Sequence, residues 1–142
     1  MKRTLLIVVF LAIVFSSVGF AQVNKYPIDI PGTNVLFFNL RYEGTTIPFE
    51  LINEIWERIN DVFITWVENG QNPAELTADD VTIGKTTDGE VAIFLKGSLI
   101  VIVDEFHARI NKTTPQKLAE VWANNLKEGV EIFVKNNTLA SM

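Results

Sequence analysis

The chain has 142 residues, of which 12 are basic and 17 acidic, with one histidine and no cysteine. This length is enough for one domain with its own apolar core. The net charge of −5 argues against a nucleic-acid-binding protein and against a polybasic membrane-surface protein, since both need clustered Lys and Arg. Without cysteine there is no disulfide, so the core must stabilise the fold.

The first 21 residues have the layout of a secretory signal peptide. Two basic residues precede the apolar run Leu5–Phe15, and the small residues Gly19 and Ala21 follow it. We expect cleavage before Gln22 and export to the bacterial periplasm or cell exterior, with ten basic and 17 acidic residues left and a net charge near −7. The alternative is an uncleaved membrane anchor, but a span needs about 20 apolar residues. After cleavage we expect no integral membrane span.

The next segment predicts an extended lead-in followed by a strand. Residues 22–33 contain Pro27 and Pro31, which favour irregular extended chain. Residues 34–42, "NVLFFNLRY", are rich in aromatic and branched side chains and predict a strand. A single α+β domain is expected from residue 34 to residue 135.

A long amphipathic helix follows, with Thr46 expected as its N-cap and Pro48 in its first turn. Its apolar residues recur at the spacing of one helical face. They are Phe49, Ile52, Ile55, Trp56, Ile59, Val62, Phe63, Trp66 and Val67. Asn69 and Gly70 are expected to end the helix, since glycine can adopt the left-handed conformation found there.

The second half predicts an antiparallel meander and a second helix. Residues 81–85, 90–96 and 98–105 are expected to form short strands separated by turn signals. Thr114 is expected as the N-cap of the second helix, with a proline in its first position. Its apolar stripe contains Leu118, Trp122, Leu126, Val130 and Phe133. We expect residues 136–142 to form a flexible tail.

These elements predict an α+β fold in the order β-α-β-β-β-α. Each helix has one apolar stripe, so both are expected to cover the same face of one sheet. The prediction is therefore a two-layer sandwich, with a mostly antiparallel four-stranded sheet and two helices on one face.

His107 is the first candidate for chemistry, together with Asp104 and Glu105. On an extended strand, Asp104 would lie on the opposite face from His107, while Glu105 would share its face. A zinc site commonly needs several His or Cys ligands, and this chain has one His and no Cys. We therefore expect a surface histidine after the last strand, with no catalytic residue, metal or cofactor.

Acidic and aromatic residues supply the remaining candidates. Carboxylates at Glu50, Glu54, Glu57 and Asp61 could hold a hard cation, but their helical spacing favours a solvated face. Asp79 and Asp80 are expected in a loop with turn chemistry. The three tryptophans could stack against a sugar.

Trp56 and Trp122 lie on core stripes, whereas Trp66 is near a helix end and is expected to be partly exposed. If the chain binds a partner or ligand through such groups, we select Trp66, His107, Asp104 and Glu105.

Residues 97–129 carry a family resemblance. They combine an apolar strand, an acidic turn, "A-R-x-N-x-T-T-P" and "L-A-x-x-W-A-x-x-L". This pattern resembles the last third of an extracytoplasmic α+β domain common in cyanobacterial envelope proteins, which often precedes a channel domain of the small-conductance mechanosensitive type. The earlier "VLFFNLRYEG" and "ERIND" also fit, so the resemblance covers about residues 35–134. It implies a periplasmic domain and supplies no enzymatic residue.

Two features depart from that family pattern. A small acidic residue usually stands at the position of His107, and no transmembrane helices follow the domain before Met142. We therefore expect a stand-alone, exported, non-enzymatic interaction module of the cell envelope, in one form a detached accessory domain of a membrane channel or transporter. Its partner would be an envelope protein or a second copy. The alternatives are a protein that binds a small ligand, a sugar or an ion, and an exported hydrolase.

Overall fold

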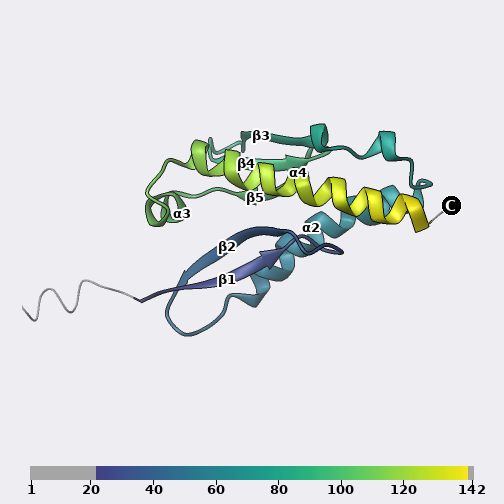
Figure 1. Ribbon diagram of the computed structural model, residues 1–142. Helices are drawn as coiled ribbons and strands as arrows, with labels where there is room; N and C mark the ends of the chain where they lie inside the picture. The colour runs from purple at the N-terminus through teal and green to yellow at the C-terminus, as the bar shows by residue number, and fades with distance from the viewer. Residues whose placement is uncertain (1–21, 141–142) are drawn as a thin grey trace, which may run out of the picture.

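The structure, a computed structural model, describes residues 22–140 (Figure 1). The signal peptide expected at residues 1–21 lies outside this range. The elements in chain order are β1 (Val23–Asp29), β2 (Leu36–Glu43), α2 (Phe49–Glu68), η1 (Pro73–Glu75), η2 (Ala78–Asp80), β3 (Val81–Lys85), β4 (Val91–Leu95), β5 (Ser98–Ile102), α3 (Glu105–Ile110) and α4 (Pro115–Ala140). No helix in this range combines the length and the apolar character that a membrane crossing requires.

The α+β class is confirmed, but the single four-stranded sheet is wrong. The strands form two antiparallel sheets, a hairpin β1–β2 and a three-stranded meander in the order β3-β4-β5. Residues 23–29, expected as a lead-in, form β1 and pair with β2 along its length. The predicted order also lacked the short helix α3.

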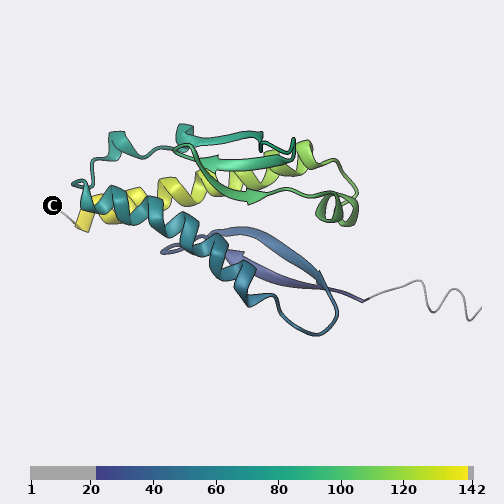
Figure 2. The ribbon, with the colours of Figure 1, turned by 180° about the vertical axis from the view of Figure 1, so that it is seen from behind.

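The long helices separate the two sheets. In Figures 1 and 2, α2 and α4 run through the middle of the molecule, with β3–β5 on one side and the hairpin β1–β2 on the other. Helix α4 contacts β2, β3 and β4, whereas α2 contacts β5. The arrangement is thus three layers rather than the expected two, because β2 pairs with β1 instead of joining the meander.

The helix ends differ slightly from the prediction. Helix α2 begins at Phe49, with Pro48 rather than Thr46 at the N-cap, and it ends at Glu68, followed by Asn69 at the C-cap and Gly70 with φ 104°. Thr114 caps α4 as expected, its hydroxyl accepting from the backbone N–H of Lys117. Helix α4 continues to Ala140, so residues 136–140 belong to the helix rather than to the expected tail.

Aromatic stacking and one close backbone approach join the layers. Phe63 of α2 stacks on Phe133 of α4 with ring centroids 3.9 Å apart, and Phe38 of β2 stacks on Trp122 at the same distance. A Cβ built on Gly129 of α4 would collide with the side chain of Ile30. Only glycine therefore lets α4 approach the end of the hairpin this closely.

Candidate functional site

His107 lies in α3 and is buried, with 5% of its surface exposed. The expected surface position is therefore wrong. The chain leaves β5 and turns at once into α3, where Asp104 is the N-cap residue. Helical geometry brings residues three apart onto one face, so Asp104 and His107 meet although a continuing strand would have separated them.

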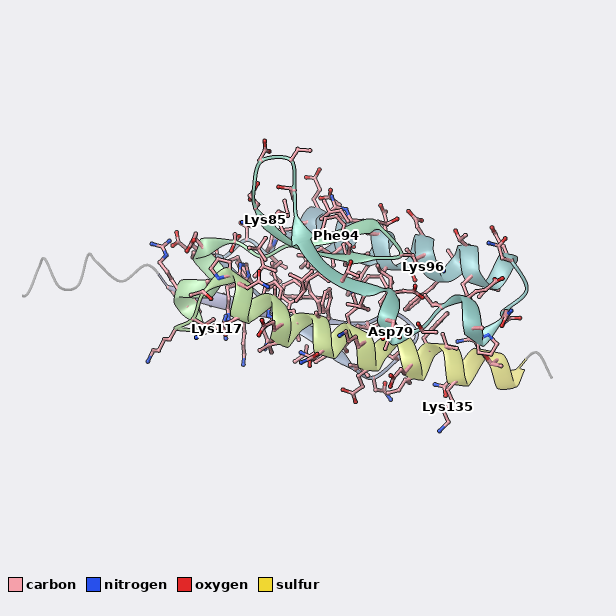
Figure 3. All side chains as sticks on the ribbon, turned by 90° about the horizontal axis from the view of Figure 1, so that it is seen from above. Asp79, Lys85, Phe94, Lys96, Lys117 and Lys135 are labelled. Atoms are coloured by element: carbon pink, nitrogen blue, oxygen red, sulfur yellow. The ribbon has the colours of Figure 1, made fainter. Side chains whose placement is uncertain are left out.

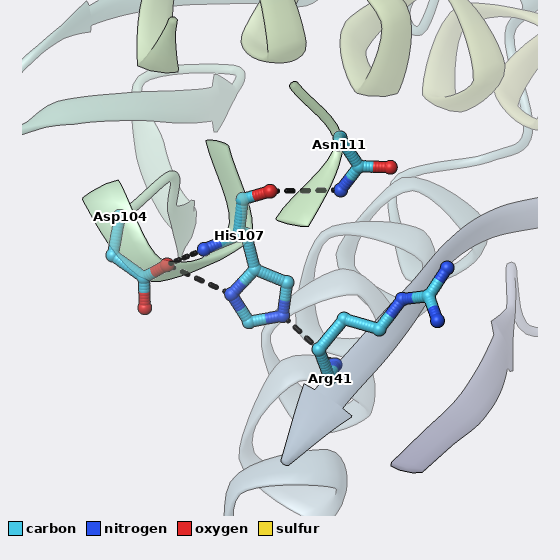
Figure 4. A network of polar contacts seen from close by, with 4 residues as sticks. All are labelled: Arg41, Asp104, His107 and Asn111. Atoms are coloured by element: carbon cyan, nitrogen blue, oxygen red, sulfur yellow. Dashed lines mark hydrogen bonds and ion pairs between the residues drawn. The ribbon is translucent and has the colours of Figure 1, made fainter. Parts of the chain in front are cut away.

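The polar network around His107 satisfies both ring nitrogens (Figure 4). Asp104 Oδ1 lies 2.8 Å from both the backbone nitrogen and Nδ1 of His107, so it accepts two hydrogen bonds. The backbone N–H of Arg41 in β2 donates to Nε2 across 2.9 Å. Because Nε2 is an acceptor here, the bonded form is the neutral ring with its proton on Nδ1.

The aromatic residues around His107 fix the plane of its ring. Phe38, Phe106 and Trp122 each meet the imidazole edge-on, at centroid distances of 6.2, 5.5 and 5.4 Å. The backbone carbonyl of His107 accepts a hydrogen bond from the Asn111 side chain. With its plane and both nitrogens held, the ring joins α3 to the outer edge of β2.

The Asp104–His107 pair has the spacing of a catalytic dyad but not its orientation. A general base needs a free ring nitrogen within reach of the proton that it removes. Nδ1 faces Asp104, and Nε2 is occupied by a backbone N–H. Acid–base work would therefore require breaking the bond to β2, so the geometry favours an architectural role.

The environment of Asp104 lowers the pKa of its carboxyl group. Burial alone would raise the pKa, but the hydrogen bonds from the ring and backbone N–H of His107 outweigh it and hold the pKa below its ordinary value. The charged form of Asp104 is thus stabilised, in keeping with its double acceptor role at the start of α3.

Two cavities lie between α2 and β5. One of about 390 Å³ is bounded by the His107 ring, Trp122, Phe38 and charged groups that include Arg58 and Glu54. The other, of about 370 Å³, is lined by Trp66 and Lys96 and again by Arg58. Both fall within the size range of small-molecule sites. Arg58 separates them by donating from Nη1 to the carbonyl of Ile100 in β5.

The other selected residues lie apart from the His107 network. Trp66 is 3% exposed rather than partly exposed, and its indole N–H donates to the carbonyl of Asn72. Trp122 is buried as expected, whereas Trp56 is only partly buried and donates to the carbonyl of Asp29. Glu105 is exposed in the first turn of α3.

The acidic series on α2 is exposed, as expected for a solvated face. Within residues 22–140 no cluster of three or more His, Cys, Asp or Glu side chains is placed to hold a metal ion. Asp80 closes a capping box at the start of η2, where its carboxylate accepts from the backbone N–H of Thr77.

Sequence reasoning missed Asn125. Its side-chain NH₂ donates to the carbonyl of Phe37 in β2 across 3.0 Å. Asn125 stands three residues after Trp122 and one before Leu126, so it is a polar residue on the apolar stripe of α4. That interruption of the stripe was the available signal, since a polar group on a packed face needs a partner.

Comparison of the chain with protein-family models, with curated proteins and with solved structures finds no match in any of the three. The resemblance of residues 35–134 to an extracytoplasmic envelope domain therefore stays a prediction.

Proposed function

We propose that the protein is an exported, non-enzymatic interaction module that binds another protein of the cell envelope. The observation that carries the proposal is the uncovered face of the sheet β3–β5. Strand register places on that side of the sheet Thr82, Gly84, Ala92, Phe94, Leu99 and Ile102. Ala92 is buried, and Leu99 and Ile102 also line the cavities beside α2, so the uncovered part of the face lies at Thr82, Gly84 and Phe94. In Figure 3, which views the molecule from above, Phe94 is labelled on the sheet and α4, which carries Lys117 and Lys135, runs alongside it.

Phe94 is the centre of this face. Its ring packs over Gly84 on the neighbouring strand, where a Cβ would approach the ring to 3.2 Å. Phe94, Leu99 and Ile102 are each partly exposed. Partly exposed apolar side chains on one side of a sheet favour a protein contact, because burying them there would remove apolar surface from water.

The role of a detached accessory domain of a membrane channel or transporter is the form of this proposal that the family resemblance favours. The occupied nitrogens of His107 support a non-enzymatic role, since they remove the best candidate for acid–base catalysis. Export is supported by the layout of residues 1–21.

The test is cross-linking in the native envelope with a tagged chain, followed by identification of the proteins that co-purify. Three forms are compared: the natural sequence, Phe94→Glu, and Ile64→Glu as a matched control at an exposed apolar position of α2. The proposal expects one membrane protein with the natural chain and with Ile64→Glu, and its loss with Phe94→Glu. Equal recovery with all three forms, or none with the natural chain, would reject it.

A second function, binding of a small ligand, is favoured by the cavity that Trp66 lines. Two cationic residues, Arg58 and Lys96, and two acidic residues, Asp61 and Glu75, line it together with the Ser98 hydroxyl. This mixture of charges suits a small zwitterionic or polyhydroxylated molecule. Because the Trp66 ring is buried, stacking on a sugar is not the expected contact. A rise in melting temperature with a panel of such compounds, lost in Lys96→Ala, would support this function.

A further inference from the structure

On the outer edges of β2, β5 and β1, helix side chains or a proline leave fewer free backbone hydrogen-bonding groups. The edge of β2 bonds to His107 and Asn125, and that of β5 bonds to Arg58. Along β1, Trp56 bonds to the backbone near the strand's end, and Pro27 occupies a position where the missing N–H would point outward.

Strand β3 has a different outer edge. Just after β3, the N–H of Thr86 bonds to the carbonyl of Glu90. In an antiparallel pair, residues alternate between bonding the partner strand and facing away from it, so this bond shows which residues of β3 bond β4. The backbone groups of the even residues therefore face β4, and those of Val81, Ile83 and Lys85 face outward. Within residues 22–140, no hydrogen bond reaches the outward N–H or C=O of Ile83 or the outward N–H of Lys85.

The free groups on this edge complement themselves. The N–H of Val81 is already bonded to the carbonyl of Ala78 at the end of η2, so Val81 offers only its carbonyl. Ile83 offers both a donor and an acceptor, and Lys85 offers a donor. Turned antiparallel about Ile83, a second β3 would place donor against acceptor at every one of these groups.

We propose that β3 pairs antiparallel with β3 of a second copy of this chain, with Ile83 opposite Ile83. The pairing joins the two three-stranded sheets into one sheet across a two-fold axis. It forms hydrogen bonds between the two Ile83 residues and, on each side, from the N–H of Lys85 to the carbonyl of Val81. The same surface patch serves both copies, as closed two-fold symmetry requires.

Charge favours this register. Asp79 and Lys85 lie near the two ends of β3 (Figure 3), and both are exposed. Neither makes an ion pair within the described part of the chain. Asp79 lies in η2 directly before β3, so antiparallel pairing about Ile83 brings each Lys85 toward the Asp79 of the other copy, and two pairs of opposite charges approach each other.

The resulting contact is small, because β3 has five residues. Small interfaces with few hydrogen bonds and exposed ion pairs are weak. We therefore expect a reversible dimer whose population rises with protein concentration and falls with added salt. This dimer does not depend on the proposed envelope partner, since it uses the edge of the sheet rather than its uncovered face.

The test is sedimentation of the purified chain from Gln22 onward, at concentrations from about 1 µM to about 1 mM. The natural sequence should shift from monomer to dimer over this range. Lys85→Glu and Asp79→Lys should each weaken the dimer about tenfold, since each replaces two attractive pairs with repulsive ones. The double variant should restore dimerisation, because the charges are then opposite again.

Two further measurements separate edge pairing from another contact. Lys85→Pro removes an outward N–H without touching the ladder to β4, so it should abolish the dimer while the monomer keeps its melting temperature. Amide exchange at Ile83 should slow as the concentration rises, with no change at Arg41.

A natural chain that stays monomeric up to about 1 mM overturns the proposal. So does a dimer that the single charge variants leave unchanged, or one that forms without added protection of Ile83. None of these results bears on the envelope partner, which the cross-linking of Phe94→Glu tests separately.

Discussion

The hairpin β1–β2 and the sheet β3–β5 both pack against α4, yet the helices bond to their outer edges unequally. Residues of α3 and α4 occupy the backbone groups along the edge of β2. Within residues 22–140, no backbone group outside the strand ladder and no side chain bonds to the outward backbone groups of Ile83 in β3, in contrast to the side-chain bonds on β2 and β5. Helix side chains thus bond the outward backbone groups of β2, which packs against α3 and α4, whereas the outward backbone groups of Ile83 in β3 are left without partners in the described part of the same chain.

Replacing His107 should have the largest effect on the closed edge. His107→Ala leaves the N–H of Arg41 without an acceptor and removes the ring that Trp122 contacts. We expect a loss of about 3 kcal/mol in the free energy of unfolding, measured in urea, with faster amide exchange at Arg41. His107→Gln, which keeps an acceptor, should lose less, and equal losses in the two variants would argue against the edge-bonding role.

Gly129→Ala should come next, because it pushes α4 away from the hairpin. The added Cβ meets the side chain of Ile30, and the overpacking should cost about 1–2 kcal/mol after the gain in helix propensity. Calorimetric melting would measure this cost. Adding Ile30→Val, which removes the nearest atom, should recover part of the loss, whereas simple additivity of the two changes would show that the layers are not in contact there.

Trp56→Phe should give a smaller change. The indole N–H donates to the carbonyl of Asp29 at the end of β1 across 3.1 Å in an exposed setting. Its loss should cost about 0.5–1 kcal/mol in urea unfolding. Trp56→His, which can restore a ring N–H donor, is a useful companion, and an unchanged stability in Trp56→Phe would mean that β1 does not depend on this bond.

The smallest expected effect is the loss of folding stability in acid that Asp104 causes. The pKa of Asp104 is lowered in the folded protein, so the charged carboxylate contributes stability that is present above its unfolded pKa of about 3.9 and is lost as the pH falls through the lower folded value. The difference in unfolding free energy between the natural chain and Asp104→Asn should therefore be largest near neutral pH and shrink below about pH 4. A difference that grew on acidification would contradict the sign.

Local patterns predicted much of the secondary structure. The apolar spacing from Phe49 to Val67 identified α2, and Thr114 with Pro115 placed the start of α4 at the observed residue. The meander was also predicted, because two-residue and short turns allow only neighbouring strands to pair. In these cases the decisive interactions lie within a few residues in the chain.

The two sheets were missed for a non-local reason. Pro27 argued against a strand, but its missing N–H points away from β2 and costs no ladder bond. The burial of His107 depends on the backbone of Arg41, 66 residues away in the chain, so no local pattern could reveal it. Asp104 looked like the end of a strand and is instead the cap of a short helix.

The bonds that close the edge of β2 also set an order of events in synthesis. They join residues 66 and 88 positions apart, His107 to Arg41 and Asn125 to Phe37. Until α3 and α4 have been made, β2 remains an apolar strand with an unpaired edge, which is the kind of segment that aggregates. Completion of the hairpin thus waits for the last quarter of the chain, and slow folding with a need for a holding chaperone is the expected kinetic consequence.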